Sequence, residues 1–130
     1  MKKIIVLLAL FAFVFASSSW DDDYDYALEM AKEENKIVLL MFSSKTCKVC
    51  TYMKTRVYPN KEVEDYINEY FVAVEIDINE YPQTFGYKIL GTPTYYFLSS
   101  TGKQIGKEMI GGAKTDAFLQ KLKEVKKSSK

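Results

Sequence analysis

The sequence has no histidine and only two cysteines, Cys47 and Cys50, which stand three positions apart. A structural zinc site takes four ligands, usually Cys and His, so one copy of the chain cannot complete such a site and we expect no bound metal. A four-cysteine site shared between chains is the remaining metal hypothesis. A purely structural disulfide explains the pair poorly, because a disulfide over this spacing closes a loop too small to constrain the unfolded chain much. A redox couple is therefore the main hypothesis.

An excess of either charge is also absent, because the chain has 18 basic and 17 acidic residues. Binding to the phosphates of nucleic acid needs a clear basic excess or a basic stripe. We therefore expect no nucleic-acid partner. The 130 residues match the size of one domain and are enough to bury a core without several disulfides.

The N-terminus differs in composition from the rest of the chain. Two lysines precede an unbroken apolar stretch from Ile4 to Phe15, and small residues follow from Ala16. This is the layout of a secretory signal peptide, and the apolar stretch is short for a membrane span, which needs about 20 residues. We predict a signal peptide at 1–16 and one domain at 17–130, exported to the periplasm or beyond and soluble after cleavage. An uncleaved anchor and a buried helix are the alternatives.

The rest of the chain alternates between helical and strand patterns. Apolar residues recur at helical spacing over 24–35, after acidic residues that can cap a helix, and the continuous apolar run at 36–42 indicates a strand buried on both faces. Val49, Met53 and Val57 recur at i, i+4 and i+8, so we expect all three in the core. The other expected elements are a helix that starts at the cysteines, a break at Pro59, a helix capped by Asn60, a strand at 71–78, a short helix at 84–88, a hairpin over 95–110 and a helix from about 115.

This order of elements indicates an α/β fold. The alternation of strand and helix implies parallel pairing through a right-handed crossover, and the late hairpin adds antiparallel strands. We predict a mixed central sheet of about four to five strands flanked by helices. Cys47 then lies at the C-terminal end of a central strand and at the N-terminus of a helix, where open α/β sheets collect their functional groups.

This position gives the two cysteines different chemistry. A thiol at a helix N-terminus faces unpaired N–H groups and the positive end of the helix dipole, so we expect the pKa of Cys47 to fall from ~8.5 toward about 3.5 to 7.5. Lys45 and Lys48 are candidates for tuning in the same direction, although both also fit as ordinary exposed loop residues. Cys50, one turn later on the same face, is expected to be more buried. Cys47 is thus the candidate nucleophile and Cys50 the candidate resolving thiol.

A second motif, "GTPT", precedes the strand pattern at 95–99. Proline cannot donate to a sheet, so Pro93 belongs at the start of a strand or in a turn. Together, "ALEMAKEENKIVLLMFSSKTCKVCTYM", "FVAVEIDI" and "ILGTPTYYFLSSTGK" resemble the thioredoxin superfamily. Within it the sequence is most similar to the exported SoxW-like thioredoxins and to the C-terminal domain of the membrane reductase DsbD.

The resemblance implies roles for residues outside the cysteine pair. Pro93 matches the family's cis-proline, which lies opposite the cysteines, and the backbone of Thr92 is then expected to pair with an extended segment of the substrate. Many relatives have a tryptophan where this chain has Thr46, a candidate substrate-facing residue. Thioredoxins also place a buried acid six positions before the first cysteine, where it assists deprotonation of the second one. Met41 stands there, so water or a carboxylate from elsewhere has to take that role.

The resemblance also implies an activity, namely thiol-disulfide exchange with exported proteins by a monomer that needs no cofactor. A reductase that receives electrons from a membrane thiol donor of the DsbD type is the favoured function. An oxidase or isomerase is the first alternative, because exported compartments are oxidising and Lys48 favours the thiolate. A binding module that holds a partner at Thr92 and Pro93 with idle cysteines is the second.

Overall fold

The computed structural model describes residues 20–130, so the predicted signal peptide lies outside the described residues. Over this range four strands form one sheet in the order β2-β1-β3-β4. β1 pairs in parallel with β2 and antiparallel with β3, which confirms the predicted mixed sheet with a central first strand. The strands are β1 (Ile37–Ser43), β2 (Phe71–Asp77), β3 (Thr94–Leu98) and β4 (Met109–Ile110).

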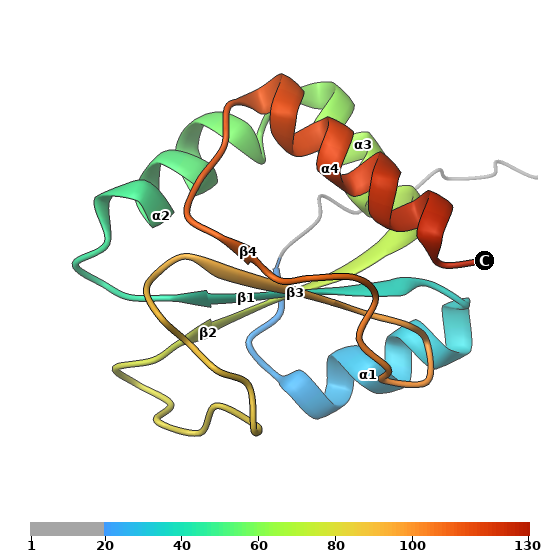
Figure 1. Ribbon diagram of the computed structural model, residues 1–130, viewed down its shortest axis with the longest axis horizontal. Coiled ribbons are helices and arrows are strands. Elements are labelled where there is room, and N and C mark those ends of the chain that lie inside the picture. The colour runs from blue at the N-terminus through green and yellow to red at the C-terminus, as the bar shows by residue number, and fades with distance from the viewer. Residues whose placement is uncertain (1–19) are drawn as a thin grey trace, which may run out of the picture.

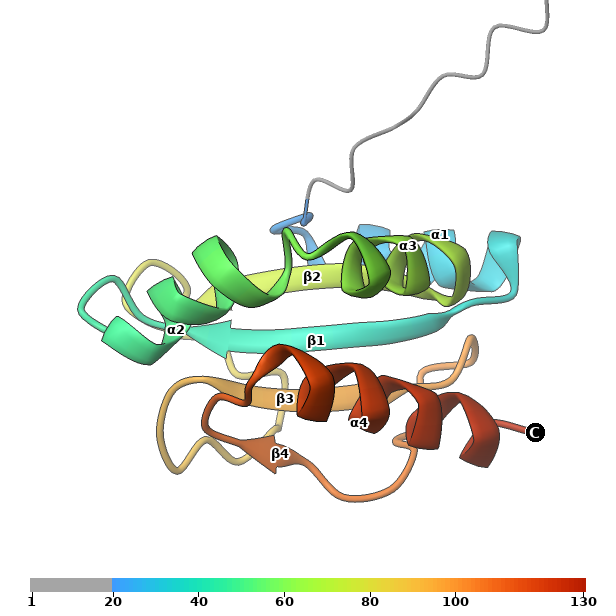
Figure 2. The same cartoon turned by 90° about the horizontal axis from the view of Figure 1, so that it is seen from above.

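Helices cover both faces of this sheet, as predicted (Figure 1). One face is covered by α1 (Tyr24–Glu34), and the other by α2, η1, α3 and α4. The helices of the second face are α2 (Lys48–Tyr52), which continues as the π-helix η1 (Met53–Val57), α3 (Lys61–Tyr70) and α4 (Thr115–Ser128). In Figure 2 the strands lie side by side, and a short loop leads from the arrowhead of β1 to α2.

Local sequence determines where these helices begin and end. The Asp23 side chain accepts a hydrogen bond from the N–H of Tyr26 and caps α1, and Asn35 ends that helix in the left-handed conformation at φ 52°. Pro59 separates η1 from α3, and the Asn60 side chain accepts from two backbone N–H groups of the first turn of α3. The predicted break and cap are therefore confirmed.

The sheet separates two hydrophobic clusters. The cluster under α1 consists of apolar residues and one tyrosine ring: Ala27, Ala31, Val38, Leu40, Phe42, Val74, Ile76, Tyr96 and Leu98. The cluster under α2, η1, α3 and α4 is larger and contains Cys50 itself. Because side chains alternate along a strand, odd-numbered residues of β1 face the cysteine side and even-numbered residues face α1. No helix within residues 20–130 is both long and apolar enough to cross a membrane.

Two expectations from the sequence are wrong. The segment 84–88 forms a turn and no helix, because Phe85 and Gly86 take positive φ values of 52° and 82°. The Phe85 ring stacks on Tyr24 of α1, with ring centroids 4.2 Å apart, so a tertiary contact replaces the local helix. Val49 is the second error, since its side chain is 45% exposed whereas Met53 and Val57 are buried. Val49 belongs to the first turn of α2, which lies beyond the last residue of β1.

The outer edge of β2 is covered by the segment that precedes α1. Asp21 forms an isolated parallel bridge with Val74, donating its N–H to Ala73 and accepting from the N–H of Glu75. The preceding residue, Trp20, stacks on the Tyr58 ring with the centroids 4.3 Å apart. Trp20 and Asp21, the first two described residues, are therefore already part of the packed fold.

Candidate active site

The cysteine pair lies where β1 ends and the α2 helix begins. Cys47 is the N-cap residue of α2, in extended conformation, and its own N–H donates to the carbonyl of Ser44 at 3.1 Å. The Cys47 sulfur accepts a hydrogen bond from the N–H of Cys50 at 3.1 Å. A sulfur that accepts from a helix N-terminus is stabilised when it carries negative charge.

The two sulfurs are joined in a disulfide, with the Cα atoms 5.2 Å apart. Cys50 is 1% exposed, whereas Cys47 is partly exposed. Only the sulfur of Cys47 is therefore accessible to a large partner, and an attack on the bond from outside has to occur there. The arrangement can exchange one disulfide for another through a bond between Cys47 and a partner thiol.

The Thr92–Pro93 peptide bond is cis, and it lies at the same end of the sheet as the cysteines. Phe42, near the end of β1, pairs with Thr94, the first residue of β3, so Pro93 lies beside the point where β1 leads into the cysteine loop. Pro93 is buried and Thr92 is partly exposed. The Pro93 carbonyl accepts from the N–H of Gly111 at 2.8 Å, which fixes the residues that follow β4 next to this loop.

Gly112 connects this loop to the cysteine helix. A Cβ atom at Gly112 would lie 2.6 Å from Cγ1 of Val49 and 3.3 Å from Sδ of Met53. The next N–H, of Ala113, donates to the same Met53 sulfur at 3.4 Å. Glycine is therefore required for the close approach of this backbone to the helix that carries the cysteines.

The residues around the pair that the sequence singled out are at the surface. Thr46 and Lys48 are exposed, and the Thr46 hydroxyl lies 3.3 Å from that of Ser44. Lys45 forms an ion pair with Glu80, which follows β2, and hydrogen bonding to this carboxylate raises the pKa of Lys45. The positive charge of Lys45 is thus paired with the Glu80 carboxylate, which weakens its effect on the cysteines.

Beneath the pair lies a buried cluster of two tyrosines and a methionine. The Tyr58 hydroxyl donates to Sδ of Met41 at 3.0 Å and is hydrogen bonded to the Tyr95 hydroxyl. Burial raises the pKa of both tyrosines well above the ordinary value. Both hydroxyls therefore remain protonated over the physiological pH range.

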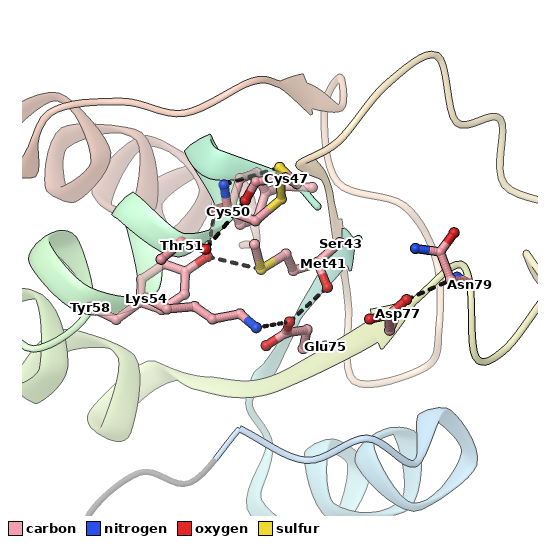
Figure 3. Close-up of polar contacts among 11 residues, drawn as sticks. Met41, Ser43, Cys47, Cys50, Thr51, Lys54, Tyr58, Glu75, Asp77 and Asn79 are labelled. Atoms are coloured by element: carbon pink, nitrogen blue, oxygen red, sulfur yellow. Dashed lines mark hydrogen bonds and ion pairs between the residues drawn. A yellow bond between two sulfur atoms is a disulfide. The ribbon is translucent and has the colours of Figure 1, made fainter. Parts of the chain in front are cut away.

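Beside this cluster lies a carboxylate that was not predicted from the sequence. Glu75 on β2 is the direct partner of Met41 in the β1–β2 register. It accepts a hydrogen bond from Ser43 Oγ at 2.6 Å and forms an ion pair of 2.5 Å with Nζ of Lys54 (Figure 3). A signal for this position was present, since the period of two along β2 places Glu75 on the same face as Phe71 and Ala73.

A cysteine pair at a strand-to-helix junction, with a cis-proline at the same end of a four-stranded mixed sheet, defines a thiol-disulfide oxidoreductase with the thioredoxin fold. The sequence profile of the thioredoxin-like domain family matches residues 24–126, and the chain belongs to this family. The protein is therefore a thioredoxin-like protein-disulfide oxidoreductase. The narrower resemblance to the SoxW-like group stays a prediction.

Three relatives illustrate the similarity. The disulfide bond reductase DsbH of Chlamydia pneumoniae is 29% identical over 128 residues, which cover 86% of this chain and 75% of the relative. The solution structure of a thioredoxin from Thermus thermophilus superposes with a TM-score of 0.74 at 25% identity, over 87% of this chain and 90% of the other. The oxidised C-terminal domain of DsbD from Neisseria meningitidis has the same fold, with a TM-score of 0.64 at 20% identity over 82% and 98% of the two chains.

Proposed function

We propose that this protein is an exported disulfide reductase or exchange protein that acts on other exported proteins. The observation that carries the proposal is the asymmetry of the couple: Cys47 is partly exposed and its sulfur accepts the Cys50 N–H, while Cys50 is 1% exposed. The similarity to a protein named as a disulfide bond reductase supports the reductive direction. The predicted signal peptide supports export.

The reaction proceeds in two exchanges of sulfur. The Cys47 thiolate attacks one sulfur of a client disulfide, so that a mixed disulfide forms and the other client sulfur leaves as a thiolate. The Cys50 thiolate then attacks Sγ of Cys47, which forms the Cys47–Cys50 disulfide and releases the second client thiolate. Two electrons have passed to the client. A dithiol on a membrane donor of the DsbD type returns the couple to the reduced form by the same exchange in reverse.

The surroundings of the couple suit a protein client. An extended client segment pairs with the backbone at Thr92, next to the buried cis-proline Pro93, and Thr46 faces the client beside Cys47. Lys45 and Lys48 favour the Cys47 thiolate. The ion pair with Glu80 reduces the contribution of Lys45. The protein acts as a monomer and needs no cofactor.

The reduction potential of the Cys47–Cys50 couple tests the direction of the reaction. Equilibration with glutathione buffers is expected to give a value near the ~−270 mV of thioredoxin, whereas a value near ~−120 mV would establish an oxidase instead.

Two substitutions test the assignment of the cysteines. Cys50→Ser is expected to trap clients as mixed disulfides on Cys47, visible as reducible bands of higher mass. Cys47→Ser is the matched control and is expected to trap none and to reduce no disulfide. Activity that survives in Cys47→Ser would contradict the catalytic proposal and favour a binding role.

A further inference from the structure

The second exchange needs a proton acceptor, because Cys50 must lose its thiol proton before it attacks Cys47. Cys50 is 1% exposed, and Met41, which belongs to the same cluster and lies beside the couple in Figure 3, cannot accept a proton. The chain has no histidine that could take this role. The acceptor must therefore be a group that faces the same cluster from another element, or bulk hydroxide.

The ionisable groups around Cys50 leave one such acceptor among the described residues. Tyr58 and Tyr95 stay protonated, because burial raises the pKa of both. The lysines on this side are cations, namely Lys45, Lys48 and Lys54. The Asp77 carboxylate, at the end of β2, lies beside Asn79, from whose N–H it accepts a hydrogen bond, and away from Met41 and the cysteines in Figure 3. Glu75 remains.

Glu75 is held on the face of the helix that carries Cys50. Lys54 follows Cys50 by four residues along α2 and η1, so the two side chains leave the same side of this helical segment. The Lys54 ammonium binds the Glu75 carboxylate at 2.5 Å, and Ser43 Oγ donates to the same carboxylate oxygen at 2.6 Å. Two donors from two different elements thus fix one oxygen of the carboxylate at this position.

The Glu75 carboxylate is open to solvent on one side. The Glu75 side chain is 18% exposed, so water reaches its carboxylate although the residue lies in a strand of the sheet. Figure 3 places the Met41 side chain between the carboxylate and the cysteines, so the two groups are not in direct contact and a proton that passes between them has to be carried by a water molecule. Glu75 is therefore a positioning residue that acts through solvent and does not touch the sulfurs.

We propose that Glu75, held by Lys54 and Ser43, takes up the proton of Cys50 through a water molecule when the mixed disulfide is resolved. The proposal rests on the proposed reductive function. The Cys50 S–H bond breaks, its proton passes through water to the Glu75 carboxylate, and the sulfur electron pair forms the bond to Cys47. The bond between Cys47 and the client breaks, and the client thiolate leaves and takes up a proton from solvent. In this chain the carboxylate of β2 thus replaces the acid that is absent at Met41.

A single-turnover experiment measures this step alone. The reduced protein is mixed with oxidised glutathione, quenched with acid and analysed by mass for the Cys47-glutathione mixed disulfide. Glu75→Gln keeps the size of the side chain and removes its charge. Resolution at pH 7 is expected to slow at least about tenfold, below the ~10²–10⁴ of a base in direct contact because water intervenes. The slowed rate is expected to rise about tenfold per pH unit as hydroxide takes over.

The matched control is Glu34→Gln. Glu34 forms an ion pair of 2.8 Å with Lys36 at the other end of the sheet, so the same change is made in a carboxylate–lysine pair remote from the cysteines. Its resolution rate and pH profile are expected to equal those of the wild type. Glu75→Asp, which restores the charge on a shorter side chain, is expected to recover most of the lost rate.

Failure of the two proposals is distinguishable. If neither the wild type nor Cys50→Ser forms a mixed disulfide with Cys47, the proposed function is wrong. If the mixed disulfide forms and Glu75→Gln resolves it at the wild-type rate with the wild-type pH profile, the role of Glu75 is wrong. Should Glu75→Gln fail to fold, the double variant Lys54→Met/Glu75→Gln removes the unpaired lysine as well, and the same slowing with the same pH profile is required of it.

Discussion

The core under α1 and the core under the cysteine helix differ in where they place their polar groups. On the α1 side the tyrosine hydroxyls reach the rim, where Tyr24 and Tyr87 lie 3.1 Å apart and Tyr96 donates to the Lys88 carbonyl. On the cysteine side the hydroxyls of Tyr58 and Tyr95 meet inside the core. The first core thus serves packing alone, whereas the second combines packing with hydrogen bonds beneath the redox couple.

The largest effect is expected from a cavity in the α1 core. Leu40 is fully buried and faces α1, so Leu40→Ala should lower the free energy of unfolding by about 2–5 kcal/mol. The reduction potential of the couple should stay within about 30 mV of the wild type, which corresponds to ~1.4 kcal/mol. Urea unfolding and glutathione equilibration measure the two quantities. A larger shift in potential would show that the two faces are not independent.

A smaller loss of stability is expected when a side chain is added at Gly112, on the cysteine side of the sheet. Gly112→Ala places a Cβ atom against Val49 and Met53, and the resulting shift of the helix should cost about 1–3 kcal/mol. Gly91→Ala is the control, because no atom lies within 4 Å of a Cβ at that position. Thermal unfolding of both variants tests the difference. Equal stability of the two would refute a tight contact between Gly112 and α2.

The buried tyrosine pair predicts a loss of stability at high pH. The pKa of Tyr58 is raised in the folded protein, so the unfolded chain releases this proton first, above pH ~10. The stabilisation is complete below pH ~10 and declines above it by about 1.4 kcal/mol per pH unit for each such tyrosine. Tyr58→Phe should make this decline shallower in urea unfolding at pH 10 to 11. Tyr26→Phe changes an exposed tyrosine and should keep the wild-type slope.

The smallest effect on stability is expected at the surface of the site. Lys45 and Glu80 form an ion pair with both side chains at least half exposed, so Lys45→Met should change the free energy of unfolding by less than about 1 kcal/mol. If Lys45 tunes Cys47, the variant should nevertheless alkylate more slowly at Cys47 near neutral pH. An unchanged alkylation rate would mean that Lys45 is structural or solvated only.

Most of the fold could be predicted because its signals are local. The apolar run of β1, the cap at Asn60 and the break at Pro59 each act within a few residues, and the structure confirms them. The segment 84–88 could not be predicted in this way, because its conformation depends on the contact between Phe85 and the distant Tyr24. Tertiary contacts of this kind leave no periodic pattern in the sequence.

The chemistry of the candidate site could be predicted from the sequence, but the contacts that hold Glu75 beside it could not. The spacing of Cys47 and Cys50 after a buried strand is enough, from the sequence alone, to indicate a redox couple. The alternation along β2 places Glu75 on the inner face, but its partners Lys54 and Ser43 come from other elements. Which helical residue meets which strand residue depends on how the helix crosses the sheet, and that geometry becomes visible only in three dimensions.

The bridge at Asp21 also has a consequence for aggregation. A sheet edge with free N–H and C=O groups is a template for another strand, and proteins protect such edges. Here Asp21 occupies part of the outer edge of β2, and the opposite edge, β4, has only two residues. Growth of the sheet from one molecule into the next is therefore hindered on both sides, which favours a protein that stays dispersed when it is concentrated.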